Sequence, residues 1–230
     1  MKRAVAAWAA RSRERRLLKP LLVGALAVLL TLAFAELGGK VLKGETHAID
    51  HWALDRAALW RADHPWLTEV MRDLSGIGST VTLTLATLIT TGYLWLATSA
   101  RVALLVFASV CSGAALMSLL KLAFGRLRPD FAQAAMVVPG LSFPSGHTTM
   151  AAIVFLTLGT LIASTRTRPR ERGYILGAAT LLTLLVGISR VMLGVHWVTD
   201  VLGGWVFGAG WAMAWLLIVG TAMRAGRQTA

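Results

Sequence analysis

Residues 189–200, SRVMLGVHWVTD, place an arginine, a histidine and a carboxylate between two long apolar stretches. Polar side chains at the edge of such stretches cost free energy unless they are paired or used in chemistry. His196 and Asp200 are four residues apart, so on a helix they would share one face. The carboxylate would then hold one imidazole nitrogen and leave the other nitrogen free to attack. This segment therefore predicts a reactive site at the edge of a membrane.

Runs without charge recur along the whole chain. The 230 residues are 56% hydrophobic and 15% charged, well below the roughly 25% charged residues of soluble domains. A helix crosses a bilayer with roughly 17–25 apolar residues. The runs lie at 21–36 (extended by Leu17 and Leu18), 73–101, 101–121, 147–166, 172–190 and 200–224. They predict an all-α, polytopic membrane protein with six transmembrane helices.

The first run follows a basic segment, and Ala33-Phe34-Ala35 is similar to the cleavage site of a secretory signal. Counted from Leu17, the run has about 19 residues, which suits a membrane crossing better than a signal core. We expect a retained first span in a single membrane domain, 1–230, whose basic N-terminus, 1–19, is cytoplasmic.

Most of the 23 Lys and Arg residues fall in alternate connections between the runs. By the positive-inside rule, this places both termini in the cytoplasm of a protein of the plasma (inner) membrane. Topology thus explains the net charge of +12, and we expect no nucleic-acid partner. The first outer loop, 36–73, shows helical spacing of apolar residues and three tryptophans, which predicts short amphipathic helices on the outer leaflet.

Two further polar clusters lie at the outer ends of the runs and predict a phosphate site. Lys121, Arg128 and Arg190 supply cations whose donors match phosphate oxygens. Ser145 and Gly146 begin a predicted helix, where free backbone N–H groups bind anions.

Two histidines would supply the chemistry at the outer (periplasmic or extracytoplasmic) face. His196, held by Asp200, would attack phosphorus, and His147 would protonate the leaving oxygen. Water would then hydrolyse a phosphohistidine intermediate. Asp130 and Asp200 alone make a poor magnesium site, so we expect neither a metal nor a cofactor. Each residue also has a structural interpretation alone, as a helix cap or an interfacial anchor, and only their combined spacing favours catalysis.

Together, Lys121-x6-Arg128-Pro129, Pro144-Ser145-Gly146-His147 and Ser189-Arg190-x5-His196-x3-Asp200 resemble the three-part signature of the type-2 phosphatidic acid phosphatase superfamily. The resemblance implies metal-independent hydrolysis of lipid phosphates or diphosphates. It implies that the nucleophile is His196, with Asp200 as its partner and His147 as the general acid. It assigns phosphate binding to Lys121, Arg128, Ser145, Gly146 and Arg190. Arg126 lies outside the signature, and we expect it only as a headgroup contact.

Three alternatives remain at this stage. Vanadate-dependent haloperoxidases have a similar signature, but they are expected to be soluble. A lipid phosphotransferase would use the same site, and a non-catalytic lipid-phosphate binder or transporter would need only the cations. Candidate substrates are phosphatidic acid, phosphatidylglycerol phosphate, an isoprenoid carrier diphosphate such as undecaprenyl diphosphate, and a phosphorylated glycolipid. The sequence leaves both the choice among them and the oligomeric state open.

Overall fold

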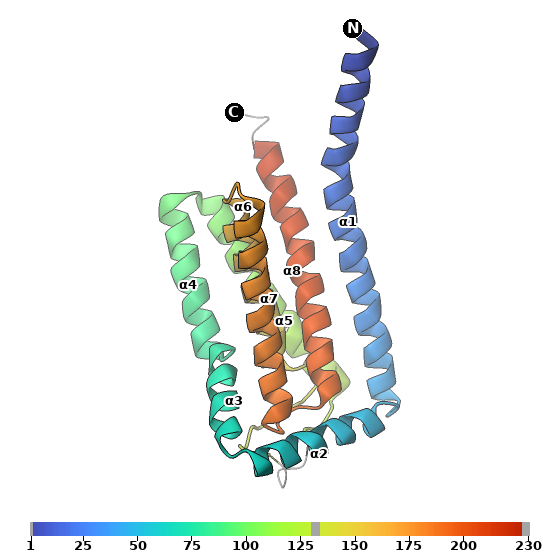
Figure 1. Ribbon diagram of the computed structural model, residues 1–230, viewed down its shortest axis with the longest axis vertical. Helices are drawn as coiled ribbons and strands as arrows, with labels where there is room; N and C mark the ends of the chain where they lie inside the picture. Colours follow the sequence, from blue (N-terminus) through green and yellow to red (C-terminus); the bar gives the residue numbers. More distant parts are fainter. Residues whose placement is uncertain (1, 130–133, 227–230) are drawn as a thin grey trace.

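The computed structural model describes residues 2–129 and 134–226, with side chains at 18, 20–129 and 134–220. The described segments are helical and contain no strand. The helices are α1 (Lys2–Leu42), α2 (His47–Asp63), α3 (Trp66–Ile77), α4 (Thr80–Ala97), α5 (Ala100–Phe124), α6 (Gly146–Ser164), α7 (Pro169–Met192) and α8 (Val198–Gly226). Figure 1 shows the long helices side by side, with α2 lying across one end of the bundle.

The described residues contain 6 helical segments that are long and apolar enough to cross a membrane, which confirms the predicted number of spans. The structure corrects two boundaries. α1 continues to Leu42 instead of ending near residue 36. The second span, Trp66–Ala97, combines α3 with α4 and begins before residue 73.

The junction between α3 and α4 has a local cause. The Ser79 hydroxyl accepts a hydrogen bond from the backbone N–H of Thr82, which is the usual cap of a new helix. Gly78 precedes it, and a Cβ there would lie 2.3 Å from Cγ1 of Val186. The junction therefore lets the chain approach α7 closely.

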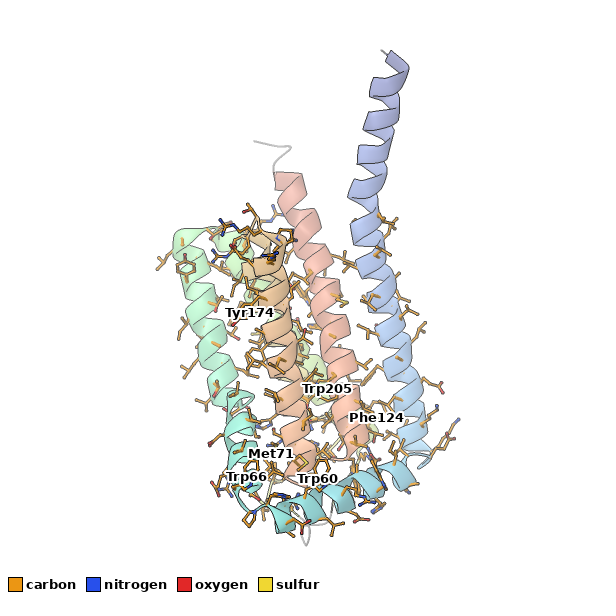
Figure 2. All side chains as sticks on the ribbon, in the orientation of Figure 1. Trp60, Trp66, Met71, Phe124, Tyr174 and Trp205 are labelled. Carbon is orange, nitrogen blue, oxygen red and sulfur yellow. The ribbon has the colours of Figure 1, made fainter. Side chains whose placement is uncertain are left out.

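Short helices were predicted in the loop 36–73, and the structure has α2 within it, whereas α3 begins there and runs on into the second span. Trp52, Trp60 and Trp66 are 62%, 58% and 62% exposed, as suits the border between lipid and water. Trp60 and Trp66 lie at the α2 end of the molecule, and Tyr174 lies toward the other end (Figure 2).

Small residues hold α6 against its neighbours in the centre of the bundle. A Cβ on Gly159 would lie 2.6 Å from Cβ of Ala179 in α7, and a Cβ on Gly208 of α8 would lie 2.6 Å from Cβ of Ala152. Such close approach is how transmembrane helices gain packing energy. It fixes the ends of α6, α7 and α8, which carry most of the predicted site.

Candidate active site

The three polar clusters come together at the end of the bundle that α2 crosses. Lys121 lies in the last turn of α5, His147 in the first turn of α6 and Arg190 near the end of α7. His196 lies in the turn between α7 and α8, and Asp200 in the first turn of α8. Figure 1 shows α2 close to where α7 ends and α8 begins.

His196 and Asp200 form a buried pair. Nδ1 of His196 lies 3.2 Å from Oδ2 of Asp200, and the two residues are 1% and 0% exposed. The helix-face argument was wrong for this pair, because His196 precedes the first residue of α8. Asp200 instead accepts a 2.9 Å hydrogen bond from the backbone N–H of Trp197 and so caps its own helix. The carboxylate of Asp200 therefore both caps α8 and pairs with His196.

Main-chain carbonyls hold the cations of the first motif. Nζ of Lys121 donates to the carbonyl oxygen of Leu141 at 2.7 Å. Arg128 donates from Nε to Gly140 at 3.1 Å and from Nη1 to Val195 at 2.8 Å. Its Nη1 also lies 3.0 Å from Nε2 of His196. One cation is therefore placed directly beside the imidazole nitrogen that faces away from Asp200.

Arg190 is 2% exposed and reaches across to α3, where it donates from Nη1 to the Ser75 hydroxyl. Its Nε is one of the buried side-chain nitrogen and oxygen atoms that have no hydrogen-bond partner among the described residues. A buried donor without a partner is costly, and a bound anion would remove that cost.

A cavity of about 490 Å³ extends from the site between apolar residues of α4 and α5. Five of the expected site residues line its polar end: Lys121, Arg128, Gly146, His147 and His196. Leu83, Leu88 and Phe107 line its apolar part between α4 and α5. Leu88 and Phe107 are 51% and 41% exposed, so the cavity reaches the surface that faces lipid.

Three of the expected residues are not among those that line this cavity, namely Ser145, Arg190 and Asp200. Ser145 is fully buried, and its backbone N–H donates to the main-chain oxygen of Asp200 at 3.0 Å. Its hydroxyl accepts a hydrogen bond from Thr148 at 3.0 Å. The structure thus shows Ser145 joining α6 to α8.

Electrostatics keep His196 neutral at ordinary pH. Burial lowers the pKa of His196 to about 3, the hydrogen bond and charge of Asp200 oppose that shift, and Arg128 and Arg190 add to it. A neutral imidazole with Nδ1 bonded to a carboxylate has its lone pair on Nε2. This is the state that a histidine nucleophile needs.

Three partners of this site were not predicted. The Ser142 hydroxyl donates to Asp200, and Ser75 accepts from Arg190. Asp50 of α2 pairs with Arg126 at 2.6 Å. Arg126 was expected as a headgroup contact, but the described residues that line the cavity do not include it. An aspartate inside the apolar spacing of α2 was the one available signal.

The chain is similar to known proteins over most of its length. A model of the PAP2 superfamily matches residues 102–224. Phosphatidylglycerophosphatase B of Bacillus subtilis is 35% identical over 187 residues, which cover 79% of this chain and 88% of the relative. A lipid A 1-phosphatase of Rhizobium johnstonii is 37% identical over 116 residues, 46% of this chain and 43% of that relative.

Solved structures show the same relationship. The crystal structure of a transmembrane PAP2 type phosphatidylglycerolphosphate phosphatase from Bacillus subtilis superposes with a TM-score of 0.77 at 30% identity. The match covers 85% of this chain and 96% of that structure. The family model spans more than half of the chain, and the sequence similarity extends beyond it. The chain belongs to the PAP2 superfamily.

Proposed function

We propose that this protein is a lipid phosphate phosphatase that hydrolyses a phosphate ester or diphosphate on a membrane lipid through a phosphohistidine intermediate. The observation that carries this proposal is the cavity beside the His196–Asp200 pair. Its polar end holds Lys121 and Arg128, and its apolar part runs between α4 and α5 to the surface that faces lipid. A ligand that matches both ends has an anionic head and a hydrocarbon tail.

In the first step, Nε2 of His196 attacks phosphorus and forms an N–P bond, while the bond from phosphorus to the lipid oxygen breaks. His147 donates a proton to that oxygen, so that the lipid leaves as an alcohol or, from a diphosphate, as a monophosphate. In the second step water gives a proton to His147 and attacks phosphorus, the N–P bond breaks, and inorganic phosphate leaves. The same pocket can transfer the phosphoryl group to another acceptor, and the measured products distinguish the two reactions.

The cations act on the transferring phosphoryl group. Nη1 of Arg128 is already 3.0 Å from Nε2 of His196, where the equatorial oxygens would gather. Arg190 would donate a hydrogen bond from Nε to the phosphoryl group, and Lys121 would contribute a positive charge. Gly146 lines the cavity at the N-terminus of α6, where backbone N–H groups favour an anion. In this proposal Ser145 assists phosphate binding through the position it gives to that helix end.

The substrates named for the relatives suggest which candidate to test first. We place phosphatidylglycerol phosphate first, because the relative that matches most of the chain is a phosphatidylglycerophosphatase. Phosphatidic acid, a phosphorylated glycolipid and an isoprenoid carrier diphosphate share the required chemistry. The site would face the outer side of the membrane, since the basic stretch 166–172, which comprises the connection after α6 and the first turn of α7, lies at the end of the bundle away from α2.

Phosphate release from purified protein tests this proposal. The wild type is incubated with each candidate lipid in mixed micelles, with and without EDTA, beside His196→Ala. We expect release from at least one lipid, no effect of EDTA, and complete loss of release in His196→Ala. Equal release by the variant would overturn the proposal, and so would a wild type inactive on every lipid. Transfer of the phosphate to a second lipid instead of water would identify a phosphotransferase.

A further inference from the structure

A buried ion network adjoins the His196–Asp200 pair, and its members Arg126 and Asp50 are not among the residues that line the cavity. Arg126 donates from Nη1 to Oδ1 of Asp200 at 2.7 Å and from Nη2 to Oδ2 of Asp50 at 2.6 Å. Both carboxylates are fully buried, and the Arg126 side chain is 12% exposed. One guanidinium therefore joins an aspartate of the outer helix α2 to the carboxylate that holds the histidine.

Neutral groups complete the network. The backbone N–H of Thr199 donates to Oδ1 of Asp50 at 3.0 Å, and its hydroxyl lies 2.9 Å from the same oxygen. The Thr46 hydroxyl lies 3.3 Å from Nη2 of Arg126. The guanidinium carbon of Arg126 lies 5.4 Å from the centre of the Trp197 ring. This packing leaves the guanidinium little freedom to turn toward a ligand.

The two oxygens of Asp200 have different partners. Oδ2 accepts from His196, Trp197 and Ser142. Oδ1 has a side-chain hydrogen bond from Arg126. Because a carboxylate is planar, the bond to Oδ1 fixes the rotation that aims Oδ2 at Nδ1 of His196. Asp50 in turn fixes the plane of the guanidinium, since it binds the opposite edge of the same fork.

We propose that Arg126 and Asp50 are positioning residues, which set the orientation of Asp200 and thereby of the His196 nucleophile. Helix α2 thus contributes to catalysis through Asp50, which lies outside the residues matched by the family model, 102–224, whereas Arg126 and Asp200 lie inside them. This inference rests on the proposed function, in which His196 attacks phosphorus. Loss of positioning should slow the chemical step, whereas the cations that bind phosphate would stay in place and substrate binding would change little.

The experiment compares kcat and KM for phosphate release by the wild type, Arg126→Lys, Arg126→Ala and Asp50→Asn. Arg56→Lys and Asp63→Asn are the controls, because both residues are exposed on α2. We expect Arg126→Ala and Asp50→Asn to lower kcat roughly 10–100-fold, by analogy with residues that orient the histidine ligands of metal sites, with KM within about threefold. Arg126→Lys restores the charge but not the fork, so it should recover only part of the loss. The exposed controls should match the wild type.

Orthovanadate supplies a readout that does not depend on turnover, because in the proposed mechanism it would occupy the phosphate site and bind Nε2 of His196. The rise in Tm with orthovanadate should be clear in the wild type and smaller in Asp50→Asn, measured on monodisperse protein. Unchanged kcat and an unchanged rise in Tm in Asp50→Asn and Arg126→Lys would overturn the inference alone. A larger KM with normal kcat would also overturn it, by making Arg126 a substrate contact. A wild type with neither phosphate release nor a rise in Tm would refute the proposed function, and the inference with it.

Discussion

Oδ2 of Asp200 lies 3.2 Å from Nδ1 of His196, although His196 stands outside the helix that carries Asp200. The contact exists because the carboxylate turns back over the first turn of α8 to cap the N–H of Trp197. The fold of the helix end therefore orients the histidine as well. A substitution at Asp200 should change both the tautomer of His196 and the cap of α8. We expect the change of tautomer to have the larger effect on activity.

Asp200→Asn tests the tautomer. The amide keeps the size of the carboxylate but can present a donor to Nδ1, which would move the imidazole proton to Nε2 and block attack. We expect kcat to fall about 10⁴-fold, as in other sites where an aspartate orients a histidine. The measurement is phosphate release, with the exposed Asp63→Asn as the matched control. Activity within tenfold of the wild type would contradict the role proposed for Asp200.

Ser75→Ala tests the support that α3 gives to Arg190. Ser75 is buried and accepts from Nη1 of Arg190, so the variant leaves that donor without its partner. Loss of the bond should destabilise the protein by about 1–3 kcal/mol and raise KM several-fold, because Arg190 would no longer be held toward the phosphate. The measurements are Tm in detergent and KM for the lipid. An unchanged KM would show that Arg190 keeps its position without α3.

Ala114→Phe tests the apolar part of the cavity. Ala114 lines the cavity from α5, whereas the neighbouring Ala115 does not line it and is exposed. A phenylalanine at 114 would fill space that we assign to the lipid chain. KM should rise about tenfold, or roughly 1.4 kcal/mol, for a long-chain lipid and change little for a short-chain, water-soluble phosphate ester. Ala115→Phe should leave both values unchanged, and an equal effect of the two variants would argue against this lipid path.

The pH dependence of stability tests the burial of His196. Its pKa is about 3 in the folded protein and about 6.5 when unfolded, so below pH 6.5 the unfolded state binds the extra proton. The contribution of His196 to stability should therefore fall as the pH drops from 6.5 toward 3, by up to about 1.4 kcal/mol per pH unit. His196→Gln should flatten this slope in denaturation measured at each pH. An identical slope in the variant would show that His196 charges freely in the folded state.

The positions of the spans could be predicted because a membrane helix needs a long run without charge, and the chain has six such runs. The sequence could also predict that the motif residues meet at one end of the bundle. Each span reverses the direction of the chain, so the end of one span and the start of the next lie on the same side of the membrane. The break between α3 and α4 was not predicted. Its cap, Ser79, is one of several polar residues inside an uncharged run, and the close approach of Gly78 to Val186 of α7 is a tertiary contact.

The ion network of Asp50, Arg126 and Asp200 could not be predicted either. Asp50 and Arg126 are separated by 76 positions, and no local pattern indicates that the two residues pair. A spacing of four residues fits a helix face as well as a helix cap. The predicted position of His196 on a helix was therefore wrong, although the predicted contact with Asp200 is present. The motif residues could be recognised in the sequence, whereas the contacts of Asp50 and Arg126 depend on tertiary packing.

Trapping of the intermediate tests the central claim most directly. Purified wild-type protein is mixed with its lipid substrate, quenched in alkali during turnover, digested and analysed by mass spectrometry. We expect phosphate bonded to the imidazole of His196, stable in alkali and lost in acid, and no such adduct in His196→Ala. Phosphate release at the full rate by His196→Ala, or an adduct on a different residue, would contradict the account.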